Sequence, residues 1–274
     1  MPTLSLITAV HPSGADFLAE TIDHLRRQVL PLGWTLEWLV QEDGTDPQLQ
    51  HHFDEFPEVS FEANRGQYGP ALTRNIALTR AAGELTAVLD QDDVLLPGAL
   101  ARLIAHFDDP SVTWAAGQAD DLLPDGSRQA YESALPPGVI PPGAVNDWAA
   151  ANGGVWPIQL AGLMVRTQAL RSVGGWGTGP GHEDATMFVA LSEHSTGYND
   201  PAVLWLYRQH EGQMTQHAGP YRRGDGKLMA LQRLHALRNP SAPPLPKTDV
   251  TFIQAAAGQK FPSGWWRAED SPGT

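Results

Sequence analysis

The chain has 274 residues, a formal net charge of −13 at pH 7 and no cysteine. The lack of cysteine excludes disulfides, zinc–thiolate sites and cysteine nucleophiles, and the acidic balance argues against nucleic acid or an anionic membrane as a partner. With 42% hydrophobic residues the chain can bury a core, and no apolar run is long enough to span a bilayer. Residues 1–4 lack the basic start of a signal peptide, so we expect a soluble, cytoplasmic protein without an integral membrane segment.

Strands and helices alternate in the first half of the chain. The apolar pattern predicts strands over residues 4–10, 35–40, 59–62, 85–89 and 112–116. Helices are expected over residues 16–28, 70–81 and 97–107. Asp16 is the expected N-cap of the first helix, and Val29 is expected on its inner face. This alternation predicts an α/β fold, with a mixed, mostly parallel sheet flanked by helices on both faces.

The second half is less regular. Four prolines in residues 135–143 exclude a helix or a central strand, so this segment is expected to be a long loop, either a linker or part of an active-site rim. Further strands are expected over residues 161–165 and 202–207, and further helices over residues 167–173, 183–193 and 227–237. A Pro-rich tail follows.

An acidic cluster follows the strand at residues 85–89, in the segment E-L-T-A-V-L-D-Q-D-D. Asp90, Asp92 and Asp93 repel one another, so the cluster is most stable around a cation such as a hard divalent ion with oxygen ligands. Ligands of open α/β sheets bind beyond the carboxyl ends of the strands, where this cluster falls. The pattern indicates a metal site in an enzyme that handles phosphates. The alternative is an acidic turn in which Asp93 caps the next helix.

Several ordered motifs carry a family resemblance. They are S-L-I-T-A-V, E-D-G-T-D, N-R-G-Q-Y-G-P-A-L-T-R-N-I-A, A-A-G-E-L-T-A-V-L-D-Q-D-D, H-E-D-A-T-M-F-V-A-L and L-Y-R-Q-H-E-G-Q-M-T. Over roughly residues 3–215 the chain resembles family 2 glycosyltransferases with a GT-A fold, which are inverting enzymes that use nucleotide sugars. The resemblance implies a GT-A catalytic domain over residues 1–218, followed by a helical and Pro-rich extension over residues 219–274. Within the domain, it implies a nucleotide-sugar-binding half (about 1–118) and an acceptor-side half (about 119–218).

The resemblance also implies roles for single residues. Asp92 is expected to coordinate Mn²⁺ or Mg²⁺, and Asp90 and Asp93 to bind sugar hydroxyls or share the ion. His210 aligns with a late histidine that reaches back to the metal, although a core or solvent-facing histidine is an equal alternative. The Glu-Asp motif of the family makes Asp184 the expected catalytic base and Glu183 the residue that orients it. Both are otherwise ordinary carboxylates of a helix N-terminus.

The remaining expected site residues concern the two substrates. The family usually has two aspartates where this chain has Glu42 and Asp43, and the change to Glu shifts the expected base contact to Asp43 or alters the nucleotide preference. Arg74 is expected to reach a phosphate or to pair with the acidic cluster. The full expected donor site comprises Thr8, Ala9, His11, Glu42, Asp43, Asn64, Gly66, Arg74, Asn75, Asp90, Gln91, Asp92 and Arg208. Weaker acceptor contacts are expected from Trp156, Trp176 and His182.

The expected function is therefore that of a metal-dependent inverting glycosyltransferase of the hexosyltransferase type. It would move a sugar from a UDP-, dTDP- or GDP-linked donor to a hydroxyl acceptor, such as a small natural product or a glycan. One alternative is a nucleotidyltransferase, which would normally have a glycine-rich loop with lysine or arginine after the first strand. This alternative is disfavoured because the loop here is His11–Gly14, H-P-S-G. Another alternative is a non-catalytic sugar- or nucleotide-binding module on a GT-A scaffold, which would lack the base or the metal carboxylates.

Overall fold

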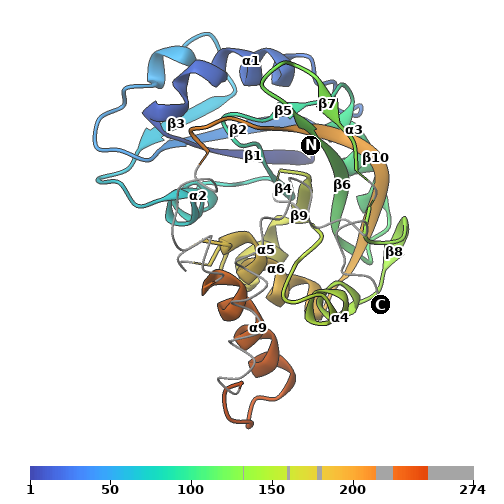
Figure 1. Ribbon diagram of the computed structural model, residues 1–274. Helices are drawn as coiled ribbons and strands as arrows, with labels where there is room; N and C mark the ends of the chain where they lie inside the picture. Colours follow the sequence, from blue (N-terminus) through green and yellow to red (C-terminus); the bar gives the residue numbers. More distant parts are fainter. Residues whose placement is uncertain (132, 159–160, 178–180, 214–224, 246–274) are drawn as a thin grey trace.

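A mixed β-sheet forms the centre of the molecule in the computed structural model, which describes residues 1–131, 133–158, 161–177, 181–213 and 225–245 (Figure 1). The strands lie in the order β3 (Val59–Ala63), β2 (Thr35–Glu42), β1 (Thr3–Val10), β4 (Leu85–Val88), β9 (Leu163–Arg166), β6 (Val112–Leu122), β10 (Thr196–Arg208) and β5 (Val94–Leu95). Strand β7 (Arg128–Gln129) pairs with β6, and β8 (Gly138–Ile140) pairs with β10. Strand β9 runs antiparallel to both of its neighbours, whereas β3, β2, β1, β4, β6 and β10 share one direction. This arrangement confirms the predicted fold class.

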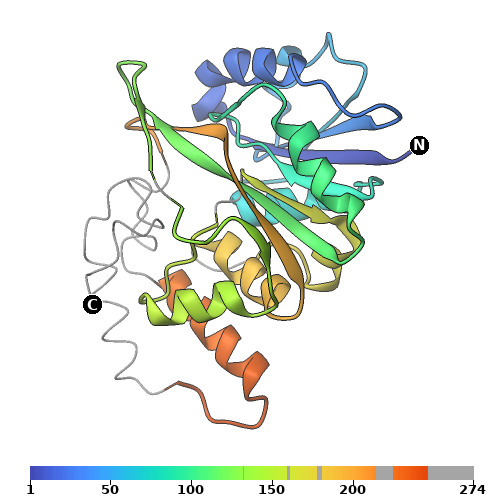
Figure 2. The ribbon, with the colours of Figure 1, turned by 90° about the vertical axis from the view of Figure 1, so that its right-hand side faces the viewer.

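Helices cover both faces of the sheet. Helices α1 (Ala15–Arg26) and α3 (Ala99–Ala105) bury leucines and isoleucines in one core layer, which also contains Trp38 and Trp205. On the other face, α2 (Pro70–Leu78), α4 (Ala144–Ala151), α5 (Thr167–Ser172) and α6 (Glu183–Glu193) pack around Trp114. Helix α9 (Asp225–Arg238) lies on the outer side of α6, where Ala230 and Leu234 join the second layer (Figure 2). Short 3₁₀ turns occupy Pro12–Gly14, Gln50–His52 and His106–Asp108.

Most predicted elements are present, with shifted ends. Gly14, not Asp16, is the N-cap of α1, and Asp16 lies in the first helical turn. Since α1 ends at Arg26, Val29 lies beyond it and is 75% exposed, so its expected place on the inner face is wrong. The Pro-rich segment is not entirely loop. Strand β8 lies between its two Pro-Pro pairs and pairs antiparallel with the start of β10. Helix α4 was not predicted at all.

The polar turns expected to form the site follow strands that end together. Val10 pairs with Glu42, and Glu42 pairs with Ala63, so β1, β2 and β3 finish at one edge of the sheet. The acidic cluster after β4 reaches the same edge, because Ile7 of β1 pairs with Val88. Parallel strands thus bring four distant turns to one place. In the part of the chain that the structure describes, no helix is both long and apolar enough to cross a membrane.

Candidate active site

Arg74 joins the two acidic motifs of the chain. It lies on α2 with a side chain that is only 7% exposed. Its Nη2 is 2.6 Å from Oδ1 of Asp90, which follows β4, and its Nη1 is 3.0 Å from Oε1 of Glu183, which begins α6. Burial alone would lower the pKa of the guanidinium, but the two carboxylates outweigh it and raise that pKa above its ordinary value. One buried cation therefore holds the end of β4 against the start of α6.

Asp184 lies beside this ion-pair bridge in the first turn of α6. Its Oδ1 accepts the N–H of Ala185 at 2.7 Å, and the side chain is partly exposed. Loss of solvent and the charge of Glu183 raise the pKa of Asp184 to about 6, against an opposing effect of Arg74. A carboxylate with such a pKa is matched to accept a proton near neutral pH.

His210 and Asp92 form a second polar pair at the same edge of the sheet. Nε2 of His210 is 2.9 Å from Oδ2 of Asp92, and the side chains are 20% and 24% exposed. Burial and the neighbouring Asp90 raise the pKa of Asp92. Arg208 holds the turn from β10, because its Nε donates to the backbone oxygen of Asp92 at 2.8 Å. The end of β10 thus closes over the acidic cluster.

Asp93 lies deeper than the other two carboxylates. It is 1% exposed, and its Oδ1 accepts the backbone N–H of Arg208 at 3.1 Å. Its Oδ2 is buried and has no hydrogen-bond partner within the described residues. Burial and the charges of Asp92 and Asp90 raise the pKa of Asp93 well above its usual range. This position favours support of the turn over direct contact with a ligand.

A divalent ion fits Asp92 and His210. Among the described residues, no three His, Asp or Glu side chains gather closely enough to hold a metal by themselves. Mg²⁺ in phosphate-handling sites is commonly held by one or two carboxylates together with substrate phosphates, and imidazole also suits transition metals. The partly exposed pair offers one ligand of each kind, in a carboxylate cluster whose mutual repulsion a cation would relieve.

Asp43 organises the loop over residues 64–69. Its Oδ1 accepts the N–H of Tyr68 at 2.6 Å and an N–H of the Asn64 amide at 3.1 Å, and its Oδ2 accepts the N–H of Gly69 at 2.9 Å. Asn64 also donates to Thr73 Oγ1. Gly69 adopts φ 82°, a left-handed conformation that favours glycine, before Pro70 starts α2. Asp43 is 8% exposed, so its hydrogen bonds first of all shape this side of the site.

Three expected donor residues have side chains that are hydrogen-bonded within the protein. Glu42 is fully buried and accepts the N–H groups of Gln48 and Leu49 at 3.2 and 2.9 Å. The remaining two are Thr8, which accepts from Trp38 Nε1 at 2.9 Å, and Asn75, whose amide pairs with the backbone of Trp176. These contacts favour structural roles for all three. The Glu at position 42 thus anchors the following loop from inside.

Replacing Glu42 by Ala is expected to lower the free energy of unfolding by about 1–3 kcal/mol, because it leaves the buried N–H group of Leu49 without an acceptor. Urea denaturation measures this change. The matched control is Glu62→Ala, which removes an exposed partner of Arg80 and is expected to cost less than about 1 kcal/mol. Equal effects of the two substitutions would contradict the anchoring role of Glu42.

The remaining expected donor residues line the end of β1 and the turn after β4. The backbone N–H of His11 donates to Oε1 of Gln91 at 2.8 Å, and His11 Nε2 is 3.2 Å from Nε2 of Gln67. Ala9, at the end of β1, and Gly66, in the 64–69 loop, are partly exposed at this edge. A side chain at position 66 would meet the ring of Tyr68 at 2.9 Å. The structure therefore brings these residues together at one edge of the sheet.

Helix α1 contributes residues that the sequence motifs did not indicate. Oε2 of Glu20 is 2.6 Å from Nη2 of Arg208, and the guanidinium lies 5.1 Å from the ring centroid of Phe17. The same ring is 4.5 Å from that of His210. In the sequence, Phe17 fits the apolar face of the helix, a pattern that indicates only a core residue.

The acceptor-side tryptophans are packing residues. Trp156 is 5% exposed and donates from Nε1 to Asn146 at 2.8 Å, and Trp176 is 2% exposed in the core layer around α6. Neither presents a ring face to a sugar, which corrects the expectation of acceptor contact for both. His182 is partly exposed and precedes Glu183 directly, at the mouth of the site.

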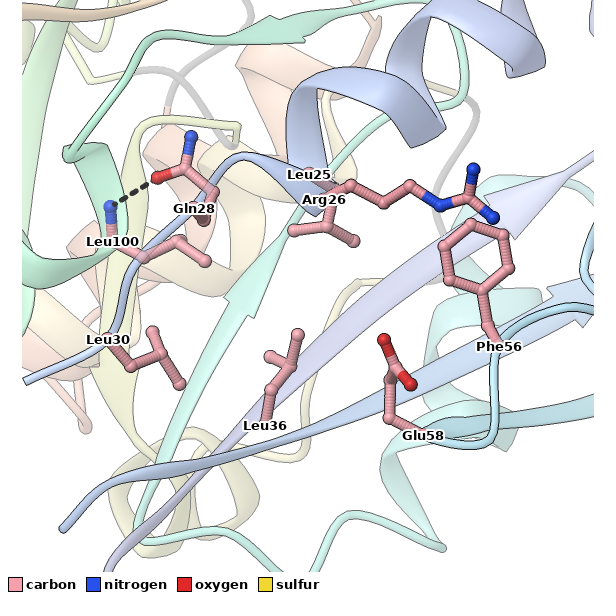
Figure 3. A pocket seen from close by; sticks show the side chains of 8 residues that line it. All are labelled: Leu25, Arg26, Gln28, Leu30, Leu36, Phe56, Glu58 and Leu100. Atoms are coloured by element: carbon pink, nitrogen blue, oxygen red, sulfur yellow. Dashed lines mark hydrogen bonds between the residues drawn. The ribbon is translucent and has the colours of Figure 1, made fainter.

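A separate cavity of about 200 Å³ lies away from these residues (Figure 3). Its walls are Leu25, Arg26, Gln28, Leu30, Leu36, Phe56, Glu58 and Leu100. Leu36 is near the start of β2, roughly 20 Å along the strand from Glu42 at its other end. The cavity is therefore not part of the candidate active site.

The strand order and the helices on both faces of the sheet define a GT-A fold, and solved structures share it. S. aureus TarS 1-349 in complex with UDP-GlcNAc is 17% identical, with a TM-score of 0.67 over 94% of this chain and 71% of that chain. The mannosyltransferase PcManGT from Pyrobaculum calidifontis, in complex with GDP-Man and Mn²⁺, is 15% identical, with a TM-score of 0.60 over 93% of this chain and 68% of that chain. No curated protein sequence matches this chain.

A sequence match supports the resemblance that the motifs predicted. Residues 5–136, slightly less than half of the chain, match the model described as Glycosyl transferase family 2. The match includes the turns after β1, β2 and β4 and the whole of α2. Asp184 and His210 lie outside it, and the case for them rests on geometry.

Proposed function

We propose that the protein is a metal-dependent, inverting glycosyltransferase that moves a sugar from a nucleoside diphosphate to a hydroxyl acceptor. The observation that carries this proposal is the Arg74 bridge, because it joins the acidic turn after β4 to the helix that bears Asp184. The family match and the relatives that bind UDP-GlcNAc and GDP-Man support a nucleotide-sugar donor.

In the proposed transfer step, Asp184 acts as the base. The acceptor hydroxyl gives its proton to the carboxylate of Asp184 while its oxygen forms a bond to the anomeric carbon of the sugar. The bond from that carbon to the diphosphate oxygen breaks, and the nucleoside diphosphate leaves with the electron pair. Attack from the face opposite the leaving group inverts the anomeric centre. The raised pKa of Asp184 supports proton transfer near neutral pH.

Asp92 and His210 are the proposed metal ligands. A divalent ion bound there would neutralise the charge that grows on the departing diphosphate. Asp90 is held by Arg74 and partly exposed, which suits a hydrogen bond to a sugar hydroxyl. Arg208 adds positive charge, since its guanidinium lies between Glu20 and the backbone of Asp92.

Nucleotide binding tests the proposal directly. UDP, GDP and dTDP are titrated calorimetrically, each with Mn²⁺ and with EDTA. We expect one nucleotide to bind with micromolar affinity in Mn²⁺, which corresponds to about −8 kcal/mol. EDTA and Asp92→Asn should each weaken binding at least about tenfold, because the charge on the diphosphate then lacks its counter-ion.

The control variant is Asp125→Asn, which changes an exposed turn carboxylate and is expected to leave binding unchanged. Failure of the folded protein to bind any of the three nucleotides contradicts the proposed donor site. Binding that is insensitive to EDTA and to Asp92→Asn contradicts the metal role alone. Release of nucleoside diphosphate from the matching sugar nucleotide, with water as acceptor, then tests catalysis without knowledge of the natural acceptor.

A further inference from the structure

The turn that leads into α6 is conformationally strained. Gly181 has φ 85° and His182 has φ 55°, so two consecutive residues are left-handed directly before Glu183. His182 is the one non-glycine residue with positive φ within the described ranges. Such a conformation costs free energy at a residue with a Cβ and persists only where the surroundings enforce it. The orientation of the proposed catalytic pair therefore depends on whatever holds this turn.

Helix α9 packs directly on the turn. Gly226, the second residue of α9, leaves no room for a side chain, because a Cβ there would lie 2.1 Å from the carbonyl oxygen of Gly181 and 2.8 Å from the Cβ of His182. Both of these atoms belong to the strained turn. The contact is backbone against backbone, so it leaves little freedom for adjustment.

Further contacts hold α9 along α6 and against the end of α5. Nη1 of Arg233 donates to the backbone oxygen of Thr186 at 2.9 Å, and its Nη2 donates to that of Val173 at 3.1 Å. At the far end, Nε of Arg238 is 2.7 Å from Oε1 of Glu193, the last residue of α6. Figure 1 shows α9 running from the start of α6 away from the sheet. The Arg233 contacts fix the register in which Gly226 meets the turn.

We propose that Gly226 is a positioning residue of the active site, which acts through Gly181 and His182 to aim Glu183 and Asp184 at the reacting groups. Helix α9 is thereby part of the catalytic unit and not a dispensable extension of a domain that ends near residue 218. Because Glu183 is tied to Arg74 and Asp90, a shift of the turn would be felt by all the charges that face Asp184. The inference rests on the proposed role of Asp184.

The test compares Gly226→Ala with Met229→Ala, a change on the exposed side of the same helix. Alanine favours a helix more than glycine does, so propensity alone predicts a stabilised protein. We expect Gly226→Ala to lower kcat for nucleoside diphosphate release by about 10–100-fold, the effect of a misplaced catalytic group. The KM for the donor should stay within about twofold, because the donor residues lie on other elements. Met229→Ala should match the wild type.

Hydrogen exchange provides a readout that does not depend on activity. We expect faster exchange of the backbone amides of Ala185 and Thr186 in Gly226→Ala and unchanged exchange in Met229→Ala. Arg233→Gln, which removes the bonds to Thr186 and Val173, should produce the same pattern and serves if Gly226→Ala does not fold. A protein that unfolds more easily but keeps the wild-type kcat while folded overturns the proposal, as does unchanged exchange in both variants. A wild type without nucleotide binding or turnover rejects the proposed function instead, and the exchange data still decide the contact.

Discussion

Replacing Asp184 by Asn is expected to lower the rate of sugar transfer by about 10²–10⁴-fold and to leave nucleotide binding unchanged. Asparagine keeps the shape and can still accept the N–H of Ala185, but it cannot take the proton of the acceptor. Release of nucleoside diphosphate measures the rate, and calorimetry measures binding. Asp16→Asn, which changes an exposed carboxylate in the first turn of α1, is the control and should retain full activity. A variant Asp184→Asn with wild-type turnover would exclude this residue as the base.

The pH dependence gives a second signature of Asp184. Since its pKa is raised to about 6, the carboxylate is protonated and inactive below that pH, and the wild-type rate should rise towards pH 6 and level off above pH 7. The raised pKa of Asp184 also means that its ionised carboxylate lowers the stability of the folded protein at neutral pH. The folded protein binds this proton more tightly than the unfolded chain, so the carboxylate costs stability above about pH 6 and nothing below about pH 4. Asp184→Asn should therefore raise the free energy of unfolding at pH 7.5, by roughly 1–3 kcal/mol, with no gain at pH 4.

The predictable part of the fold is the part that local rules govern. Runs such as L-S-L-I-T-A-V form β1 because both faces of a central parallel strand are buried, and Pro70 starts α2 because its missing N–H costs nothing there. Helix α4 is not predicted from the sequence because its buried face, which consists of Val145, Asn146 and Ala149, gives only a weak apolar pattern. Strand β8 is not predicted from the sequence because its three residues form a strand only by pairing with β10, which is distant in sequence.

For the candidate site too, the sequence predicts some features and not others. Family motifs indicated Asp90, Asp92, Asp184 and His210, but the motifs do not report which way a side chain points. Glu42 and Asn75 occupy motif positions, yet the side chain of each is hydrogen-bonded to the backbone of a neighbouring segment. The contact of Gly226 with His182 has no sequence signal, since it depends on the packing of two helices whose relative position is set by the whole fold.

Removal of the Arg74 guanidinium is expected to have the largest effect on stability. The substitution Arg74→Met fills a similar space but leaves the carboxylates of Asp90 and Glu183 without their counter-ion. Loss of one partner of a buried ion pair typically costs about 3–5 kcal/mol, because the remaining charge stays desolvated. Urea denaturation at neutral pH measures the loss. The control is Arg27→Met, which breaks an exposed pair with Asp23 on α1 and should change stability by less than about 0.5 kcal/mol.

A double substitution separates the structural and catalytic contributions of this bridge. Glu183→Gln in the Arg74→Met background removes the buried uncompensated charge, so we expect it to restore part of the lost stability although each single change destabilises. Activity should not return, because the cation that ties the turn after β4 to the start of α6 is still missing. If the double variant regained both stability and turnover, the bridge would be a matter of folding alone. If it regained only stability, the ion pair of Arg74 with Glu183 would be needed to hold Asp184 in the orientation that the transfer step requires.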